Sequence, residues 1–217
     1  MKNHPGEGFY FVFEGGEGVG KTTQINILIR KLRRNYPRLK VVRTREPGGT
    51  LLGEEVRKII LSDKYSPIGP RTEALLYASA RSQFLEKKIQ PVLKRRNIII
   101  ADRCYSSSVV YQGIVKGLSE NYIYKLHEEI LKDAMPDLII IIDLDPKIGL
   151  ARKHKQGEVN RFERESLKFH QQVRQGYLKF AKENPKLTKV IDGSLPISDQ
   201  AFMIWQAVEL AIRREKE

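Results

Sequence analysis

Short apolar runs recur along the chain and alternate with stretches of helical periodicity. The runs have strand length and are rich in β-branched or aromatic residues, and they lie at Phe9–Phe13, Leu39–Thr44, Ile98–Ala101, Leu138–Ile142 and Lys189–Ile191. Between them, apolar residues spaced three or four apart predict helices. This alternation is typical of an α/β protein, in which a parallel sheet is covered by helices on both faces.

The helical stretches have limits that the sequence pattern indicates. The predicted helices cover residues 20–36, 52–61, 71–88 with an extension past Pro91 to about 96, 106–111, 119–132, 146–153 and 161–184, and residues 194–196 open a last one. In the second of these, Leu52, Val56 and Ile59 form the predicted buried face. We find no repeat or interdomain linker, which favours one domain over residues 1–217.

The predicted topology places the functional groups. In an open parallel sheet, ligands bind at the carboxyl ends of the strands. The residues that follow the first four strands are Gly15–Thr22, Arg45–Thr50, Asp102–Arg103 and Asp143. We therefore expect these four segments to meet at one edge of the sheet.

The first of these segments fits the phosphate-loop pattern G-x-x-x-x-G-K-[ST]. It lies between a predicted strand and a predicted helix, as a phosphate loop requires. Glycines let backbone N–H groups converge on an anion, and the helix N-terminus adds positive potential. The predicted nucleotide-binding residues are Gly15, Gly16, Glu17, Gly18, Val19, Gly20, Lys21, Thr22 and Thr23, with Lys21 reaching the β/γ-phosphates and Thr22 binding Mg²⁺.

Charged residues near the phosphate loop raise three further questions. Asp102 ends an apolar strand, where an acid can hold Mg²⁺ or its waters, and Asp143 competes for that role. Arg103 suits the clamping of phosphoryl groups, although a structural ion pair is the alternative. A carboxylate at Glu17 repels a triphosphate unless it accepts from a basic side chain, a sugar hydroxyl or a metal-bound water.

Three helical pairs and one basic stretch complete the candidate chemistry. Residues four apart on a helix share a face, so an aromatic and a guanidinium there can stack on a base and read its edge. Tyr77/Arg81 is such a pair. Ser107/Tyr111 and Ser108/Gln112 repeat the spacing and offer hydroxyl and amide groups for a sugar or base. The basic, glycine-containing stretch 152–163 predicts a lid over phosphates, with a solvated loop as the alternative.

Composition narrows the function further. The chain of 217 residues carries one cysteine, which excludes an internal disulfide and fits a reducing cytosol. No apolar run approaches the ~20 residues of a membrane span, and the N-terminus lacks the apolar core of a signal peptide. The net charge of +13 is compatible with an anionic partner, but the basic residues are spread along helices and tails, which favours a basic surface.

Taken together, the motifs resemble those of the bacterial-type thymidylate kinase family, from about residue 9 to 213. They are EGGEGVGKTT at 14–23, TREPGGT at 44–50, DRCYSSS at 102–108 and YQG at 111–113. The resemblance implies a P-loop NTPase-type sheet of five parallel strands, a lid at about 152–163, and transfer from ATP to dTMP with Mg²⁺ in DNA precursor synthesis. It also implies a cytoplasmic homodimer without a nucleic-acid or membrane partner.

The resemblance further implies roles for single residues. Tyr77 matches the residue that stacks on thymine, and Arg81 and Gln112 match those that read the base edge. Arg57 and Arg103 match arginines at the dTMP phosphate, Ser108 and Glu17 match acceptor-site positions, Tyr111 matches a tyrosine under the deoxyribose, and Glu46–Pro47 matches a cis peptide beside the acceptor phosphate. With Glu17 in place of a loop arginine, the lid supplies the catalytic arginine, which is Arg161 or Arg152.

Two other classes compete with this interpretation. A nucleic-acid-dependent ATPase would fit the positive charge, but it would carry a second acid after the strand that ends at Asp102, where this chain has Arg103. A regulatory GTPase would carry an Asn-Lys-x-Asp motif, which the sequence lacks. We therefore expect direct in-line phosphoryl transfer without a protein nucleophile.

Overall fold

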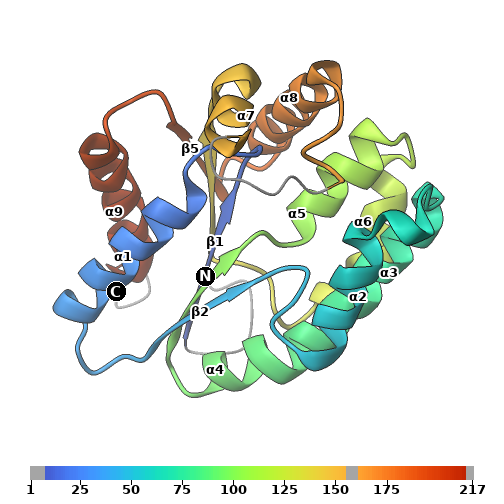
Figure 1. The fold of residues 1–217 in the computed structure, drawn as a ribbon. Coiled ribbons are helices and arrows are strands. Elements are labelled where there is room, and N and C mark those ends of the chain that lie inside the picture. Colours follow the sequence, from blue (N-terminus) through green and yellow to red (C-terminus); the bar gives the residue numbers. More distant parts are fainter. Residues whose placement is uncertain (1–7, 155–160, 214–217) are drawn as a thin grey trace.

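The computed structural model describes residues 8–154 and 161–213. Within these residues, five strands form one parallel sheet in the order β2-β3-β1-β4-β5 (Figure 1). They are β1 (Phe9–Glu14), β2 (Val41–Arg45), β3 (Ile98–Asp102), β4 (Leu138–Asp143) and β5 (Thr188–Asp192). Each predicted strand is present, and the predicted α/β architecture is confirmed.

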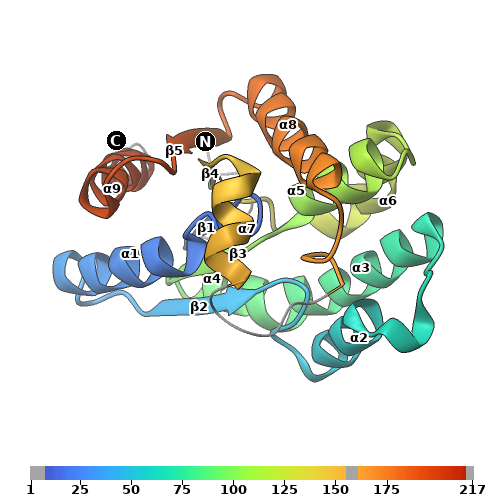
Figure 2. The ribbon, with the colours of Figure 1, turned by 45° about the horizontal axis from the view of Figure 1, so that its top comes forward.

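The two faces of the sheet bury different helices, because successive residues of β1 point to opposite sides. Phe11 packs with α1 and α9, whereas Val12 packs in the larger core with the helices of the opposite face. Figures 1 and 2 show α1 (Lys21–Asn35) and α9 (Ile197–Arg213) on one side of the sheet. The helices on the opposite side are α2 (Leu51–Leu61), α3 (Pro70–Phe84), α4 (Gln90–Lys94), α5 (Tyr105–Ser108), α6 (Glu120–Leu131) and α8 (Leu167–Glu183). The helix α7 (Pro146–His154) lies next to the phosphate loop at the carboxyl edge of the sheet.

The predicted helix over 71–88 is interrupted. α3 ends at Phe84, a π-helical turn η2 covers Leu85–Ile89, and α4 follows. Pro91 lies in the first turn of α4, where its missing N–H and its ring prevent an ordinary α-helical bond to the preceding turn. The wider π turn accommodates this break.

Two more helix boundaries differ from the sequence-based expectation. The helix predicted at 106–111 is α5 followed by the π-helical segment η3 (Val109–Val115), which extends four residues further. The helix predicted to begin at 161 begins at Leu167 as α8, because Ser166 Oγ accepts from Phe169 N and caps it there. Residues 161–164 form a turn that precedes α8.

The predicted buried face of α2 is wrong in part. Val56 and Ile60 are buried, but Leu52 is exposed and Ile59 is only half-buried. Gly53 faces inward instead, because a Cβ there would lie 2.8 Å from the carbonyl oxygen of Gly48. The rotation leaves apolar side chains of α2 on the surface.

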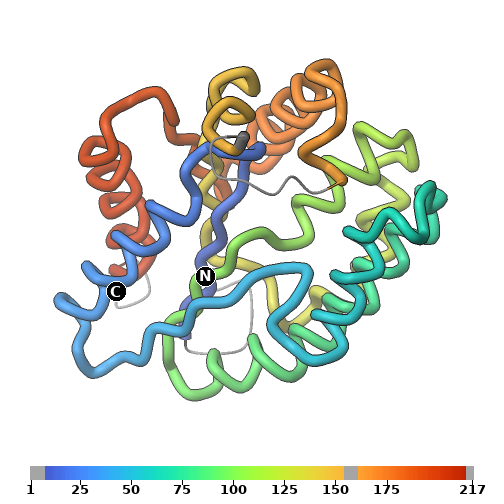
Figure 3. The backbone as a smooth tube through the Cα atoms, viewed as in Figure 1, coloured from blue at the N-terminus to red at the C-terminus, as the bar shows by residue number. Residues whose placement is uncertain are grey.

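The segments that follow β1, β2 and β3 meet at one edge of the sheet, as Figure 3 shows for the backbone. Glu46 N, after β2, donates to Asp102 O at the end of β3, and Arg103 N donates to Phe13 O in β1. The Glu46–Pro47 bond is cis, as expected, and Ser66–Pro67 is a second cis bond. None of the described helices is long and apolar enough to cross a membrane.

Candidate active site

The phosphate loop has the backbone that its glycines permit. Gly15, Gly18 and Gly20 all have positive φ, and a Cβ on Gly18 would lie 1.9 Å from the carbonyl oxygen of Gly149. α1 begins directly after Gly20, so its free N–H groups face the loop. Lys21 Nζ donates to the carbonyl oxygens of Gly15 (3.1 Å) and Gly16 (2.9 Å). The loop is therefore already curved around the lysine.

Glu17 accepts from a basic side chain, which is one of the alternatives that the sequence leaves open. Its Oε1 lies 2.7 Å from Arg103 Nη2. Burial alone would raise the pKa of Glu17, but Arg103 and then Lys21 lower it, and the net shift is downward. Burial and the nearby Arg103 lower the pKa of Lys21. Arg103 and Lys21 thus surround one carboxylate with positive charge.

Arg103 is held in place from several sides. It follows β3 with a φ of 76°, which is rare outside glycine. Its Nη1 donates to Gly15 O (3.2 Å), to Ser107 Oγ (3.3 Å) and to Tyr177 OH (2.9 Å). The guanidinium therefore lies between the phosphate loop and α5, where an anion bound to either element would meet it.

Glu14 organises the segment after β3, and sequence reasoning missed it. This buried carboxylate accepts from Cys104 N, Ser106 Oγ and Tyr177 OH at 2.6–3.0 Å, and also from Ser107 N and Oγ. Because Glu14 is the last residue of an otherwise apolar strand, an acid in that position is the signal that could have identified it.

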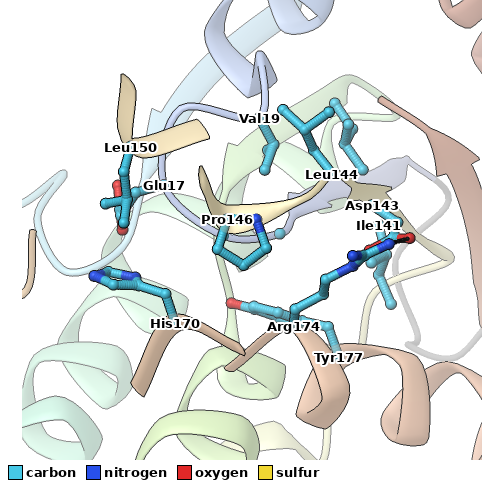
Figure 4. A pocket seen from close by; sticks show the side chains of 13 residues that line it. Glu17, Val19, Ile141, Asp143, Leu144, Pro146, Leu150, His170, Arg174 and Tyr177 are labelled. Atoms are coloured by element: carbon cyan, nitrogen blue, oxygen red, sulfur yellow. Dashed lines mark hydrogen bonds and ion pairs between the residues drawn. The ribbon is translucent and has the colours of Figure 1, made fainter. Parts of the chain in front are cut away.

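The two candidate acids of the sheet edge have different surroundings. Asp143 binds Arg174 through both carboxylate oxygens, at 2.6 and 2.8 Å, on the far side of a small hollow behind the phosphate loop (Figure 4). Asp102 lines the main cleft, and its buried Oδ1 has no partner among the described residues. A buried, unpartnered carboxylate oxygen that lines the same cleft as Thr22 fits a hydrated Mg²⁺, so Asp102 rather than Asp143 suits that role.

Arg81 is almost fully committed to buried partners. Its side chain is 2% exposed, with Nε donating to Glu46 Oε2 at 2.6 Å and Nη1 to Ser108 Oγ at 3.0 Å. Its Nη2 donates to Cys104 O at 3.2 Å. A guanidinium has five N–H donors, and the described residues leave one hydrogen of Nη2 without an acceptor. Arg81 is thus a fixed fork with one free donor.

His127 supports Arg81 from α6, and sequence reasoning missed it too. Its Nδ1 lies 2.8 Å from Ile123 O, and its Nε2 lies 2.5 Å from Arg81 Nη1. Burial, with a smaller effect of Arg81, lowers the pKa of His127 to about 3, so the ring is neutral. A carbonyl oxygen only accepts, so the proton is on Nδ1, and Nε2 accepts from the guanidinium.

A second buried carboxylate, Glu73 in α3, lies next to the predicted base-reading residues. Its Oε1 accepts from Gln112 Nε2 at 2.7 Å, and Lys116 Nζ contacts both of its oxygens. Arg161 Nη2 donates to its Oε2. No sequence motif pointed to this acid.

Most of the predicted site residues line one cleft of about 790 Å³. They include Glu17, Gly18, Val19, Gly20, Lys21, Thr22, Thr23, Glu46, Arg57, Tyr77, Arg81, Asp102, Arg103, Ser107, Ser108, Tyr111, Gln112 and Arg152. Gly15 and Gly16, at the start of the loop, line the small hollow behind it instead. Residues 155–160 of the predicted lid lie outside the described residues.

The two candidate lid arginines are placed differently. Arg152, in α7, lines the cleft. Arg161 does not line it but pairs with Glu73, and the neighbouring Arg164 pairs with Asp63. Phe162 lines the cleft and packs edge-on against Tyr111, with ring centroids 5.8 Å apart. The turn 161–164 therefore lies against the α2–α3 side of the cleft.

Comparison with known proteins gives one consistent result. A family model described as Thymidylate kinase matches residues 13–204. The chain is 45% identical over 204 residues to the thymidylate kinase of Geobacillus sp. (strain WCH70), covering 93% of this chain and 96% of that one. It is 41% identical over 207 residues to the thymidylate kinase of Anoxybacillus flavithermus, covering 94% and 98%. The structure is similar to that of thymidylate kinase from Ehrlichia chaffeensis, with a TM-score of 0.76, 32% identity and coverage of 94% and 99%.

Proposed function

The chain belongs to the thymidylate kinase family, which phosphorylates dTMP to dTDP with ATP in nucleotide biosynthesis, and we propose that the cleft lined by the phosphate loop, Tyr77 and Gln112 is its active site. The carrying observation is that one cleft joins the phosphate loop to the segment around Tyr77 and Gln112. Two nucleotides bound at these ends would place their phosphates toward each other, near Arg103. Positioning and charge stabilisation then account for catalysis.

The donor end is the phosphate loop. Lys21 exchanges its two loop carbonyls for the β/γ-phosphates, and the N–H groups at the start of α1 hold the remaining oxygens. Thr22 and Asp102 are the residues that would hold Mg²⁺ or its waters, because both line the cleft and Asp102 Oδ1 is unpartnered within the described residues. When bound, the ion neutralises charge on the transferring phosphoryl group.

The acceptor end is built for a thymine nucleotide. Tyr77 is half-buried and offers its ring as a stacking surface, and the free Nη2 hydrogen of Arg81 donates to the carbonyl at position 4 of the base. Gln112 Oε1 accepts from N3–H. Tyr111 lies beneath the deoxyribose, and Arg57, whose Nη1 is 3.3 Å from Pro47 O, holds the phosphate with Arg103.

Two arginines complete the transfer. Arg103 lies between the phosphate loop and α5, so its guanidinium bridges the donor and acceptor phosphates. As the two nucleotides bind, it exchanges the Glu17 carboxylate for phosphate oxygens. We assign the catalytic lid role to Arg152, because it lines the cleft whereas Arg161 is paired with Glu73. No protein nucleophile takes part.

We further propose that residues 1–217 form one thymidylate-kinase-like domain, which assembles as a homodimer in the cytoplasm. Every described helix packs on the one sheet or on neighbouring helices, which supports a single domain. Leu51 is 92% exposed at the start of α2, and Leu52 and Leu75 are half-exposed on α2 and α3. Such an apolar surface supports a homodimer that buries it. A reduced thiol at Cys104 fits the cytoplasm.

A panel of acceptors tests the proposed site. ADP release is measured with ATP and dTMP, dUMP, dCMP or UMP. The expected order of kcat/KM is dTMP, then dUMP, then dCMP, with UMP poor. Loss of the methyl group alone lowers kcat/KM by about 10–200-fold. The amino group of cytosine would leave the Arg81 donor unpaired, and Tyr111 disfavours a 2′-hydroxyl. If dCMP or UMP outruns dTMP, these assignments are wrong, and stimulation by DNA in place of dTMP would indicate a nucleic-acid-dependent ATPase.

A further inference from the structure

The carboxylate of Glu73 lies at a position from which it controls a neighbour in the acceptor site. It is completely buried in α3, one turn before Tyr77. Its Oε1 lies 2.7 Å from Gln112 Nε2, and its two oxygens lie 2.7 and 2.8 Å from Lys116 Nζ. Arg161 supplies a third partner. One carboxylate therefore joins α3, the π-helical segment η3 and the turn before α8.

The contact with Gln112 fixes which end of the amide faces the cleft. An ionised carboxylate accepts hydrogen bonds and donates none. The group of Gln112 that contacts Glu73 must therefore be the NH₂, and the amide oxygen is left for the cleft that Gln112 lines. Without such a partner, the two ends of a glutamine amide are nearly equivalent in shape and exchange by rotation.

We propose that Glu73 is a positioning residue that sets base selectivity by holding the Gln112 amide in this orientation. The inference rests on the proposed function, in which Gln112 meets N3 of the base. Thymine and uracil carry a hydrogen on N3 and need an acceptor there. Cytosine has a bare N3 and needs a donor. When the Gln112 amide oxygen faces the cleft, it accepts from the N3–H of thymine. With cytosine, the same oxygen would face the lone pair of N3, and the two lone pairs would repel each other.

The two cations on Glu73 make this orientation stable. Burying a carboxylate is costly unless cations and hydrogen-bond donors surround it. Lys116 and Arg161 are mostly buried, and both pair with the Glu73 carboxylate, so its oxygens accept from cations as well as from the Gln112 amide. Both lie over the ring of Phe162, with Lys116 Nζ and Arg161 Cζ at 5.2 and 4.8 Å from its centroid. The acceptor-only character of Glu73 is thus built into its surroundings.

The central test is the variant Glu73→Gln. A glutamine there both donates and accepts, so the Gln112 amide is no longer held in one orientation. The ratio of kcat/KM for dTMP over that for dCMP should fall by about tenfold, through lower activity on dTMP and higher activity on dCMP. The matched control is Glu120→Gln, which removes an ion pair to Lys179 on the surface between α6 and α8 and should leave the ratio unchanged.

A cycle with Gln112→Ala separates this role from a general structural one. Gln112→Ala alone should lower the ratio, and adding Glu73→Gln should lower it no further, because Glu73 acts through the amide. An unchanged ratio in Gln112→Ala overturns the inference even if Glu73→Gln does not fold. Equal losses on dTMP and dCMP in Glu73→Gln also overturn it. A wild-type protein without preference for dTMP would instead contradict the proposed site.

Discussion

Residues 15–22 form the donor end of the cleft within a single turn of chain, whereas the acceptor end draws on β2, α3, η3, α6 and the turn before α8. At the donor end, Lys21 rests on two loop carbonyls that it can exchange for phosphate oxygens. At the acceptor end, Arg81 and Glu73 are buried charges with partners 23–88 residues away in the sequence. The donor end is local and adaptable, and the acceptor end is long-range and rigid.

The two ends should therefore respond differently to substitution. Removing a donor-end side chain takes away a contact to the ligand and leaves the glycine backbone as it was. Removing a member of the acceptor network leaves a buried charge without its partner, which costs stability as well as activity.

The largest loss of stability is expected for Arg81→Ala. Glu46 loses the only charged partner that it has among the described residues, and burial already raises the pKa of this carboxyl. The free energy of unfolding, measured by urea denaturation, should fall by about 3–5 kcal/mol, and activity on dTMP should be lost. Arg174→Ala breaks the more exposed pair with Asp143 and should cost about 1 kcal/mol or less. Equal losses in the two variants would contradict the rigid-network view.

The donor end should lose rate without losing stability. Lys21→Ala removes the charge aimed at the β/γ-phosphates, so kcat should fall by about 10²–10³-fold. The free energy of unfolding should change by less than about 1 kcal/mol, because the glycine loop keeps its backbone. Arg34→Ala, on the exposed face of the same helix, serves as the control for both measurements. Retention of about a tenth of the wild-type kcat would remove Lys21 from its assigned role.

The two ends should also weaken in different pH ranges. The pKa of His127 is lowered from 6.5 to about 3, so between these values the unfolded chain binds a proton that the folded chain does not. The free energy of unfolding therefore decreases as the pH is lowered, by about 2 kcal/mol between pH 6.5 and pH 5. The pKa of Glu17 is also lowered, so its contribution is complete above the ordinary Glu value and is lost only as pH falls further, through the folded pKa.

Unfolding measured at several pH values checks this order. His127→Gln keeps an acceptor for Arg81 and removes the titrating ring, so the loss of stability between pH 6.5 and pH 5 should shrink. Glu17→Gln should leave that range unchanged and alter only the more acidic limb. A wild-type protein whose stability is flat down to pH 5 would show that His127 is not held neutral in solution.

The same contrast explains what the sequence could predict. The strands, their parallel arrangement and the phosphate loop follow from contiguous patterns, in which residue type and spacing along the chain are sufficient. Tyr77, Arg81 and Gln112, whose positions the family motifs predict, line one cleft. The roles of these residues stay predictions until the acceptor panel is measured.

The sequence alone does not identify the residues that support the site, and the reason is physical. Glu73 and His127 look like ordinary polar positions of amphipathic helices, and only the packing of α3 against α6 and η3 buries them. The two π-helical turns were missed because their hydrogen-bond shift leaves no period in the sequence. Glu14 was detectable in principle, since an acid at the end of an apolar strand needs partners.

The smallest expected effects concern the two candidate lid arginines, of which Arg152 lines the cleft and Arg161 belongs to the buried acceptor network. Arg152 lines the cleft and is exposed, so it can act on the phosphates without cost to the fold. Arg152→Ala should lower kcat by about tenfold with little change in the KM for dTMP, because its contact matters mainly during transfer. Steady-state rates at saturating ATP give both constants.

Arg161→Ala is the matched comparison, since it also replaces an arginine by alanine but does so in the buried acceptor network. Its partner Glu73 keeps the ion pair with Lys116 but loses one of its two cationic partners, so the carboxylate is less firmly held. We expect a higher KM for dTMP and a loss of about 1–3 kcal/mol in unfolding free energy, with kcat nearly unchanged. The reverse result, a kcat loss in Arg161→Ala and none in Arg152→Ala, would place Arg161 on the phosphates during transfer. The Glu73–Arg161 pair would then belong to the resting enzyme alone, and the turn 161–164 would have to leave the acceptor side in each catalytic cycle.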